Sequence, residues 1–398
     1  MSGERSIAQL DKRLCTGCLA CSKACPEQCI SSNHDACGFL YPHIDHKKCI
    51  GCGRCVSVCP QCTPLELVRP STAYAAAGRS AEKITYSTSG GIFALLSDYV
   101  IKNGDLVCGA VLQEDLTLQH CLTNDADMIK RMRGSKYIQS DLSFALEDIL
   151  EALKQGKRVL FCGTPCQVAA VRALSNDAKN LYTIDLICHG VPSAVAFSRY
   201  VKDRLRIRNV TNVTFRDKNK YVSSSYSLVF ERLDKKGALK RQRILAHEDV
   251  FYQAFLDGSS YRESCYTCPY ARDMRVGDIT IGDCANERTY RHMELGDVLS
   301  TVLINTEKGF QLFDFIKKDL NYTVASYEQE TCLNGQLQAP VARDESRDCF
   351  YQDIFSLPIR HLKKKYLPKR SLSARFKQAL IWHVPLAVRK KLIALMKK

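Results

Sequence analysis

Two stretches of the sequence repeat one spacing of cysteines: CTGCLACSKACP over residues 15–26 and CIGCGRCVSVCP over residues 49–60. The offset is 34 residues, so that Cys15 corresponds to Cys49 and Cys25 to Cys59. The chain has 398 residues and 21 cysteines, and its first residues are polar, without the apolar core of a signal peptide. A secreted disulfide framework is normally a short chain with such a leader. We therefore expect a cytoplasmic protein whose reduced thiols bind metal.

Each run has the pattern C-x2-C-x2-C-x3-C followed by proline, which is typical of bacterial ferredoxins with two clusters. In such proteins the fourth cysteine of each run ligates the cluster of the other run. The spacing predicts two 4Fe-4S clusters, one held by Cys15, Cys18, Cys21 and Cys59, the other by Cys49, Cys52, Cys55 and Cys25. Zinc, which also binds C-x2-C pairs, is the alternative. Cys29, Cys37 and Cys62 fall outside the pattern, and we expect them to pack in the core or beside the clusters.

The rest of the chain predicts an α+β fold. Strands and helices alternate through DLVCGAVLQ (105–113), SFALEDILEALKQGK (143–157) and RVLFCGTPCQVAAVRAL (158–174), and antiparallel strands follow from about residue 208. We expect a ferredoxin-like domain over residues 1–70, a linker ending near residue 83, a larger mixed α/β domain over 84–355 and a basic helical tail over 359–398.

A second set of cysteines lies in the larger domain. Cys265 and Cys268 form a C-x2-C pair, while Cys166 and Cys188 each follow a predicted strand, where α/β sheets place ligands. These four predict a third 4Fe-4S cluster. Replacement of one of them by Cys162 or Cys284, or a zinc site, remains the alternative.

Six motifs follow one another in this domain: STSGGIFALL, RGSKYIQSDL, FCGTPCQVAAVRAL, DLICHGVPS, CYTCPYARDMRVGDITIGD and LSTVLINTEKG. In this order they resemble the beta-subunit family of coenzyme F-420 hydrogenases and dehydrogenases, which also includes chloroplast 7-hydroxymethyl chlorophyll a reductase. The resemblance covers roughly residues 84–355. It implies a flavin-binding domain with non-covalently bound FAD beside a 4Fe-4S cluster, and a deazaflavin (coenzyme F-420) or another organic substrate at the flavin.

The resemblance also implies which residues meet the flavin. Glycines let the backbone approach a ligand, and a helix N-terminus favours a phosphate. The implied flavin-binding residues are Ser89, Gly90, Gly91, Ser135, Lys136, Tyr137, Gln139, Thr164, Pro165 and Gln167. His189 is a candidate proton donor near the flavin, with a loop histidine bonded to backbone as the alternative.

The net charge of +15 comes from the tail. Residues 359–398 contain 13 Lys and Arg and no acidic residue, which leaves 44 basic against 42 acidic residues elsewhere. The body therefore has no nucleic-acid signature. The tail also carries Leu, Ile, Phe and the single Trp, a composition that fits helices on an anionic membrane surface, here its inner face. Nucleic-acid binding, docking of an acidic ferredoxin and a solvated, partly disordered tail are the alternatives.

Together these features predict a ferredoxin- or deazaflavin-linked oxidoreductase, in which electrons pass between the ferredoxin-type clusters and FAD and on to the organic substrate. The protein supplies binding and electrostatics, while the cofactors supply the redox chemistry. A ferredoxin or another redox protein is the expected partner. The alternative is a non-catalytic electron-transfer subunit of a hydrogenase or formate dehydrogenase complex.

Overall fold

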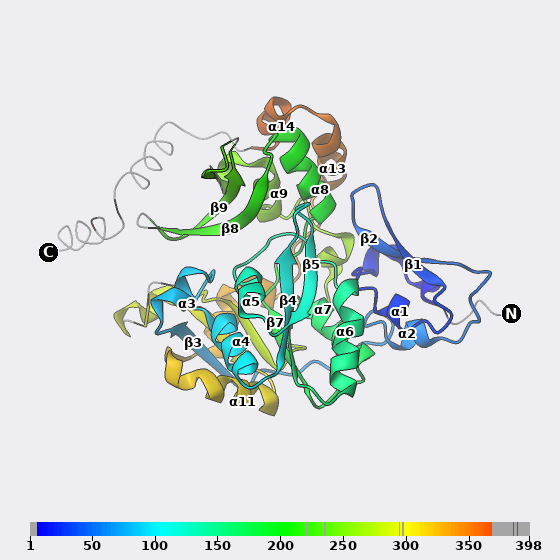
Figure 1. The fold of residues 1–398 in the computed structure, drawn as a ribbon, viewed down its shortest axis with the longest axis horizontal. Coiled ribbons are helices and arrows are strands. Elements are labelled where there is room, and N and C mark those ends of the chain that lie inside the picture. The colour runs from blue at the N-terminus through cyan, green and yellow to red at the C-terminus, as the bar shows by residue number, and fades with distance from the viewer. Residues whose placement is uncertain are drawn as a thin grey trace.

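The protein is described here from a computed structural model, which covers residues 6–219, 222–234, 236–293, 295–296 and 298–367, together with Pro385 and Val388. In these residues the chain forms a small cysteine-rich domain, a large mixed sheet with helices on both faces, and a small antiparallel sheet (Figure 1). The mixed α/β architecture of the second domain agrees with the predicted α+β class.

The cysteine-rich domain repeats its backbone as well as its sequence. Its elements are a short 3-10 helix (Ile7–Gln9), α1 (Ala20–Lys23), β1 (Ile30–His34), β2 (Leu40–Ile44) and α2 (Arg54–Ser57), with β1 and β2 paired antiparallel. Gly17 and Gly51 hold equivalent places in the two runs, and both are left-handed, with φ of +68° and +67°. A left-handed backbone favours glycine because that residue has no Cβ. Each turn leads into a one-turn helix that carries the third cysteine of its run.

The large sheet has the strand order β13-β3-β12-β11-β7-β6-β4-β5. Its strands are β3 (Thr72–Gly78), β4 (Leu106–Leu112), β5 (Leu118–Thr123), β6 (Val159–Gly163), β7 (Leu181–Leu186), β11 (Ile279–Asp283), β12 (Ser300–Ile304) and β13 (Leu320–Ala325). The four central strands β4, β6, β7 and β11 are parallel, and antiparallel strands flank them on both sides. The loops that follow β6, β7 and β11 consequently meet at one edge of the sheet, where the candidate site lies.

Helices cover both faces of this sheet. One face carries α4 (Ile92–Lys102), α5 (Ala126–Met132) and α11 (Glu307–Ile316), and the other carries α6 (Ser143–Lys154) and α7 (Pro165–Leu174). Each group closes its own apolar core. In Figure 1 the cysteine-rich domain lies beside α6 and α7, at the right of the molecule.

The small sheet and its helices build a third apolar core. It contains β8 (Val210–Asn219), β9 (Val222–Leu233) and β10 (Leu239–Leu245), all antiparallel. Helices α8 (Ala194–Arg199), α9 (Val250–Leu256), α13 (Arg347–Ser356) and α14 (Ile359–Tyr366) pack around it. Two short helices, α10 (Glu287–Tyr290) and α12 (Tyr327–Leu333), follow β11 and β13, and α3 (Ala81–Thr85) follows β3.

The predicted linker is wrong for residues 72–85. Thr72–Gly78 forms β3 inside the large sheet, and α3 comes next, so the second domain begins before residue 84. The sequence TAYAAAG hid this strand because alanine has a low strand propensity, whereas here Ala75 and Ala76 are fully buried between neighbouring layers.

The start of the predicted tail is a folded helix of the second domain. In α14, Leu362 is fully buried in the core around the small sheet, and Lys365 pairs with Asp353 at 2.5 Å. Apart from Pro385 and Val388, the tail beyond Leu367 lies outside the described residues.

Candidate functional site

The first cysteine site is a hollow lined by all four cysteines that the spacing assigns to it. Cys15, Cys18 and Cys21 come from the first run, and Cys59 reaches the same hollow from the end of the second run. The structure thus brings together the predicted set, including the member contributed by the other run.

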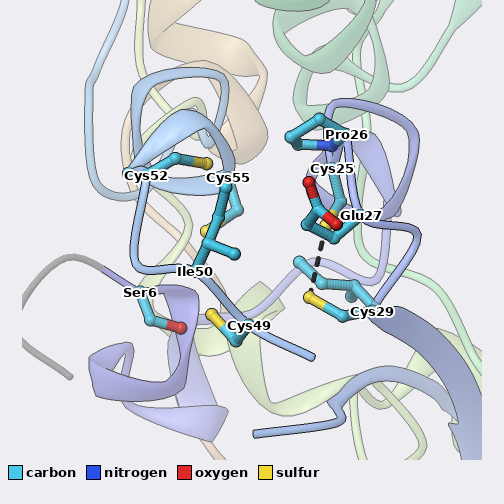
Figure 2. A pocket seen from close by; sticks show the side chains of 11 residues that line it. Ser6, Cys25, Pro26, Glu27, Cys29, Cys49, Ile50, Cys52 and Cys55 are labelled. Atoms are coloured by element: carbon cyan, nitrogen blue, oxygen red, sulfur yellow. Dashed lines mark hydrogen bonds between the residues drawn. The ribbon is translucent and has the colours of Figure 1, made fainter. Parts of the chain in front are cut away.

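The second site has the same construction. Figure 2 shows Cys49, Cys52 and Cys55 around a hollow, with Cys25 of the first run opposite. Cys29, which the spacing left outside the pattern, also lines this hollow.

The donors around the two hollows fit an anionic iron-sulfur cluster. Gln61 lines the first hollow, and its buried Nε2 has no hydrogen-bond partner in the described part of the chain. At the second site the Ile7 amide donates to Cys55 Sγ at 3.4 Å. Burial raises the pKa of Cys18 to about 12, so a thiolate there requires a positive metal centre to stabilise it. N–H donors and thiolates of this kind are the groups that hold iron-sulfur clusters.

No three His, Cys, Asp or Glu side chains in the described residues converge closely enough to hold a single metal ion. The cysteines of both runs instead surround a space. The cysteines of the two runs therefore line two hollows in the structure. That these residues ligate clusters stays a prediction.

The third predicted set also comes together. Burial raises the pKa of Cys188 to about 12, and the neighbouring thiols of Cys166 and Cys268 raise it further. The same three cysteines surround Cys265, whose pKa burial raises well above the usual value. Cys166 follows β6, Cys188 follows β7, and the C-x2-C pair lies in the loop before β11.

The two alternative cysteines lie elsewhere. Cys284 donates to Glu330, a carboxylate that is 1% exposed and also accepts from Thr301. Cys162 lies beside Lys136 and Asp185 instead of the third set. The geometry thus favours the predicted four over either replacement, although their role as ligands stays a prediction.

Tyr270 lies between the first and third cysteine sets. It is 5% exposed and packs in one apolar cluster with Cys18 of the first set and with Cys166 and Cys268 of the third. Those three thiols and Cys59 add to the burial that raises the pKa of the Tyr270 hydroxyl. The first and third sets are consequently neighbours across the domain boundary.

Arg262 fastens the two domains together beside these sets. Its guanidinium donates to the carbonyl oxygens of Cys15 (2.7 Å) and Leu40 (2.9 Å), and it lies 4.1 Å from the centroid of the Tyr41 ring. The side chain is 1% exposed, and no carboxylate in the described residues pairs with it. Its own neighbour Cys265 donates its amide to the Arg262 carbonyl. The sequence analysis did not identify Arg262 or Tyr270. Both lie within three residues of the C-x2-C pair in the sequence, and this position was the only signal that could have indicated them.

The predicted flavin motifs meet at the carboxyl edge of the sheet through a polar network. Asp283, at the end of β11, accepts from Ser89 and from Arg216 (2.8 Å). Arg216 also donates to the Tyr137 hydroxyl at 3.3 Å, and the Tyr137 ring stacks on Phe255 with centroids 4.5 Å apart. The network joins the SGG loop, the GSKY motif and the small sheet. Asp283 and Arg216 were not among the predicted site residues.

The SGG loop contains two glycines with different roles. A Cβ on Gly90 would lie 2.2 Å from the Ala76 carbonyl oxygen, so glycine is required there by packing against β3. Gly91 has a φ of +83° and starts α4 without a side-chain cap, which leaves the helix N-terminus to its backbone amides. That terminus suits an anion such as a flavin phosphate.

Several other predicted flavin residues use their polar atoms within the protein. Lys136 Nζ donates to three carbonyl oxygens at the end of α5, and burial lowers its pKa to about 7. Gln139 donates to Thr16, and Gln167 donates to Ser140. Gln139 thus serves the domain interface, and Lys136 holds the turn after α5.

The other predicted residues lie at or near the sheet edge. Thr164 caps α7 together with Gln167, its hydroxyl lies 3.3 Å from Cys166 Sγ, and Pro165 is the first residue of the helix. The Ser135 amide donates to Thr88 at 2.6 Å. His189 is exposed, with its ring 6.3 Å from that of Phe255.

Comparison with known proteins finds matches in both the cysteine-rich region and the second domain. Residues 156–330 match the family described as the C terminus of the coenzyme F420 hydrogenase/dehydrogenase beta subunit. Residues 8–31 and 40–61 each match a 4Fe-4S binding domain. None of the curated proteins shows a significant match.

One solved structure is a chain of the F420-reducing [NiFe] hydrogenase complex from Methanosarcina barkeri. It is 18% identical, with a TM-score of 0.45, and the alignment covers 75% of the present chain and 91% of that chain. None of the helices in the described residues combines the length and apolar character needed to cross a membrane.

The class that emerges is that of iron-sulfur electron-transfer proteins. More particularly, residues 156–330 match the C-terminal domain of the coenzyme F420 hydrogenase/dehydrogenase beta subunit, and two 4Fe-4S ferredoxin motifs lie in front of that domain.

Proposed function

We propose that the chain is an iron-sulfur flavoprotein oxidoreductase, which passes electrons between ferredoxin-type clusters and FAD and on to a deazaflavin (coenzyme F420) or another organic substrate. The observation that carries this proposal is the apolar cluster that Tyr270 shares with Cys18 of the first set and with Cys166 and Cys268 of the third. Electron transfer between separate centres requires them to be near each other, and here members of both sets pack on one cluster. The third set in turn shares the sheet edge with the Ser89–Asp283–Arg216 network.

The FAD site would lie at this edge of the sheet. The amides at the start of α4 and the buried Arg216 guanidinium offer hydrogen-bond donors and positive charge to phosphates, and Ser89, Tyr137 and Thr164 lie at the same edge. When bound, FAD exchanges one electron at a time with iron-sulfur centres and two electrons as hydride with an organic substrate. His189, exposed at this edge, is a candidate proton donor.

A second candidate function is a non-catalytic electron-transfer subunit. The matched family is described as a beta subunit of hydrogenases and dehydrogenases, which favours a partner that holds the catalytic centre. Under both candidate functions the partner would be a redox protein. For the oxidoreductase that partner would be a ferredoxin.

Flavin content and turnover decide between the two. The full chain is purified without oxygen, the flavin is released by denaturation and quantified by fluorescence, and reduction of the deazaflavin is followed with a reduced ferredoxin as donor. The proposal predicts about one flavin per chain and turnover by the isolated chain. Bound flavin without turnover, together with a hydrogenase or dehydrogenase subunit recovered alongside the chain from its host, would establish the second candidate.

Membrane binding by the tail is proposed from the sequence alone, because residues 368–398 are almost wholly outside the described part of the chain. Its 13 basic residues, counted from Ile359, suit an anionic membrane surface at the inner face of the membrane. Binding of the full chain to anionic but not to neutral lipid vesicles tests it.

A further inference from the structure

A fifth cysteine lines the second hollow. Cys29 is 5% exposed, and its Sγ lies 3.3 Å from Cys25 Sγ, as the dashed line in Figure 2 shows. Cys25 is the member of the set that comes from the other run. At the first site the outside cysteine, Cys62, interacts with Cys59, but it is exposed and does not line the hollow.

The separation of the two sulfurs places them at the same corner of the site. Ligand thiolates on different irons of a cluster stand apart, because the irons and sulfides lie between them. Two sulfurs 3.3 Å apart are close enough to reach the same iron, and the Cys29 thiol also interacts with Cys49 of the same set. Cys25 and Cys29 are therefore competitors for one coordination position.

The backbone holds Cys29 in this place. Gln28 is left-handed, with a φ of +47°, and its amide donates to the Cys25 carbonyl, so the chain turns back on itself between the two cysteines. A left-handed conformation is unfavourable for a residue with a Cβ. The carbonyl of Cys29 then accepts from the Asp45 amide at 2.8 Å, directly before β1 begins.

We propose that Cys29 is a reserve ligand, which replaces Cys25 on the same iron of the second 4Fe-4S site. The exchange breaks the iron bond to the Cys25 thiolate and forms one to Cys29. The proton that Cys29 gives up is taken by Cys25, and no electron is gained or lost. The site then keeps four cysteine ligands when the Cys25 thiolate leaves the iron. This inference rests on the proposed cluster at the second run.

The test compares two ligand deletions at the same site. Iron and acid-labile sulfide are quantified in the full chain purified without oxygen, and the dithionite-reduced protein is examined by EPR. Cys25→Ala keeps the iron content of the natural chain, with an altered EPR signal, because Cys29 takes the position. Cys52→Ala loses about four irons per chain, because Cys29 lies against Cys25, on the opposite side of the hollow from Cys52.

Further variants identify the replacing residue. Cys29→Ala alone keeps its iron and its EPR signal, and Cys25→Ala combined with Cys29→Ser loses about four irons per chain. Full iron in that double variant would exclude Cys29 as the replacement. If the double variant does not fold, the single variants decide: an equal loss of iron in Cys25→Ala and Cys52→Ala overturns the proposal. A natural chain without a second cluster would instead refute the site on which it rests.

Discussion

At the scale of single residues, the strongest feature of the molecule is a buried arginine between its two parts. Arg262 donates to carbonyl oxygens of the cysteine-rich domain and to the Gln139 side chain of the second domain, at 3.2 Å. Charged groups of this kind are costly to bury, so their hydrogen bonds must be complete. Arg262 therefore holds the first cysteine site against the second domain.

Arg262→Met should loosen this contact without unfolding the second domain. Loss of the donors leaves buried carbonyl oxygens unpaired, at a cost of about 3 kcal/mol, so amides near Cys15 and Leu40 should exchange hydrogen roughly 100-fold faster. Hydrogen exchange followed by mass spectrometry measures this. Arg13→Met, which removes an exposed arginine paired with Asp11, is the matched control and should exchange like the natural chain. Unchanged exchange in Arg262→Met would contradict the docking role.

His120 should make stability depend on pH. The ring is 1% exposed, its Nε2–H donates to the Cys162 carbonyl, and burial lowers its pKa from 6.5 to about 4. The unfolded chain then binds more protons between these two values, so the folded state loses about 3 kcal/mol as the pH falls from 6.5 to 4. Above pH 6.5 this contribution is fully present.

Denaturant unfolding of His120→Gln across this range measures the effect. The variant should show a pH dependence that is smaller by about 3 kcal/mol, because its amide keeps a donor without titrating. His34→Gln replaces an exposed histidine and should follow the natural profile. Parallel profiles for His120→Gln and the natural chain would show that the buried ring is protonated in the folded state.

At the scale of elements, the packing of the SGG loop against β3 separates a structural from a ligand role for Gly90. A Cβ there would press on the Ala76 carbonyl and on the Ser300 amide, 3.1 Å away. Gly90→Ala should therefore destabilise the flavin-free protein by about 1–3 kcal/mol, measured by denaturant unfolding. Gly335→Ala, at a position with no atom within 4 Å, should change little. A stable Gly90→Ala protein that no longer binds flavin would assign the glycine to the ligand instead.

Much of the element pattern could be predicted from the sequence. The predicted alternation of strands and helices is confirmed by β4, α6, β6 and α7, and α6 ends just before the left-handed Gly156, as expected of a helix with a glycine after its end. The alanine-rich β3 was not predicted, because it is stabilised as a strand by burial on both sides, and no local sequence pattern reveals such burial. The cysteine sets were predicted from spacing and strand ends, and the structure brings them together.

The contacts that join these sets could not be predicted in the same way. Arg262 and Asp283 act through partners more than a hundred residues away in sequence, Cys15 and Ser89. Lys136 and Gln139 are the opposite case. Their motif predicts contact with a ligand, but in the structure both side chains donate to backbone carbonyl oxygens of the protein.

At the scale of the whole molecule, three cysteine sets and a polar sheet edge follow one another across the domain boundary. The second set adjoins the first within the cysteine-rich domain, the first meets the third at Tyr270, and the third lies at the edge that carries the predicted flavin residues. The central claim is that all three sets hold 4Fe-4S clusters in this one chain.

Iron and acid-labile sulfide per chain, measured on protein purified without oxygen, test that claim most directly. The account predicts about twelve irons in the natural chain and about eight in Cys265→Ala/Cys268→Ala. Cys332→Ala/Cys349→Ala, which removes two exposed cysteines outside the three sets, should keep about twelve. About eight irons in the natural chain, or zinc in place of the third cluster, would contradict it.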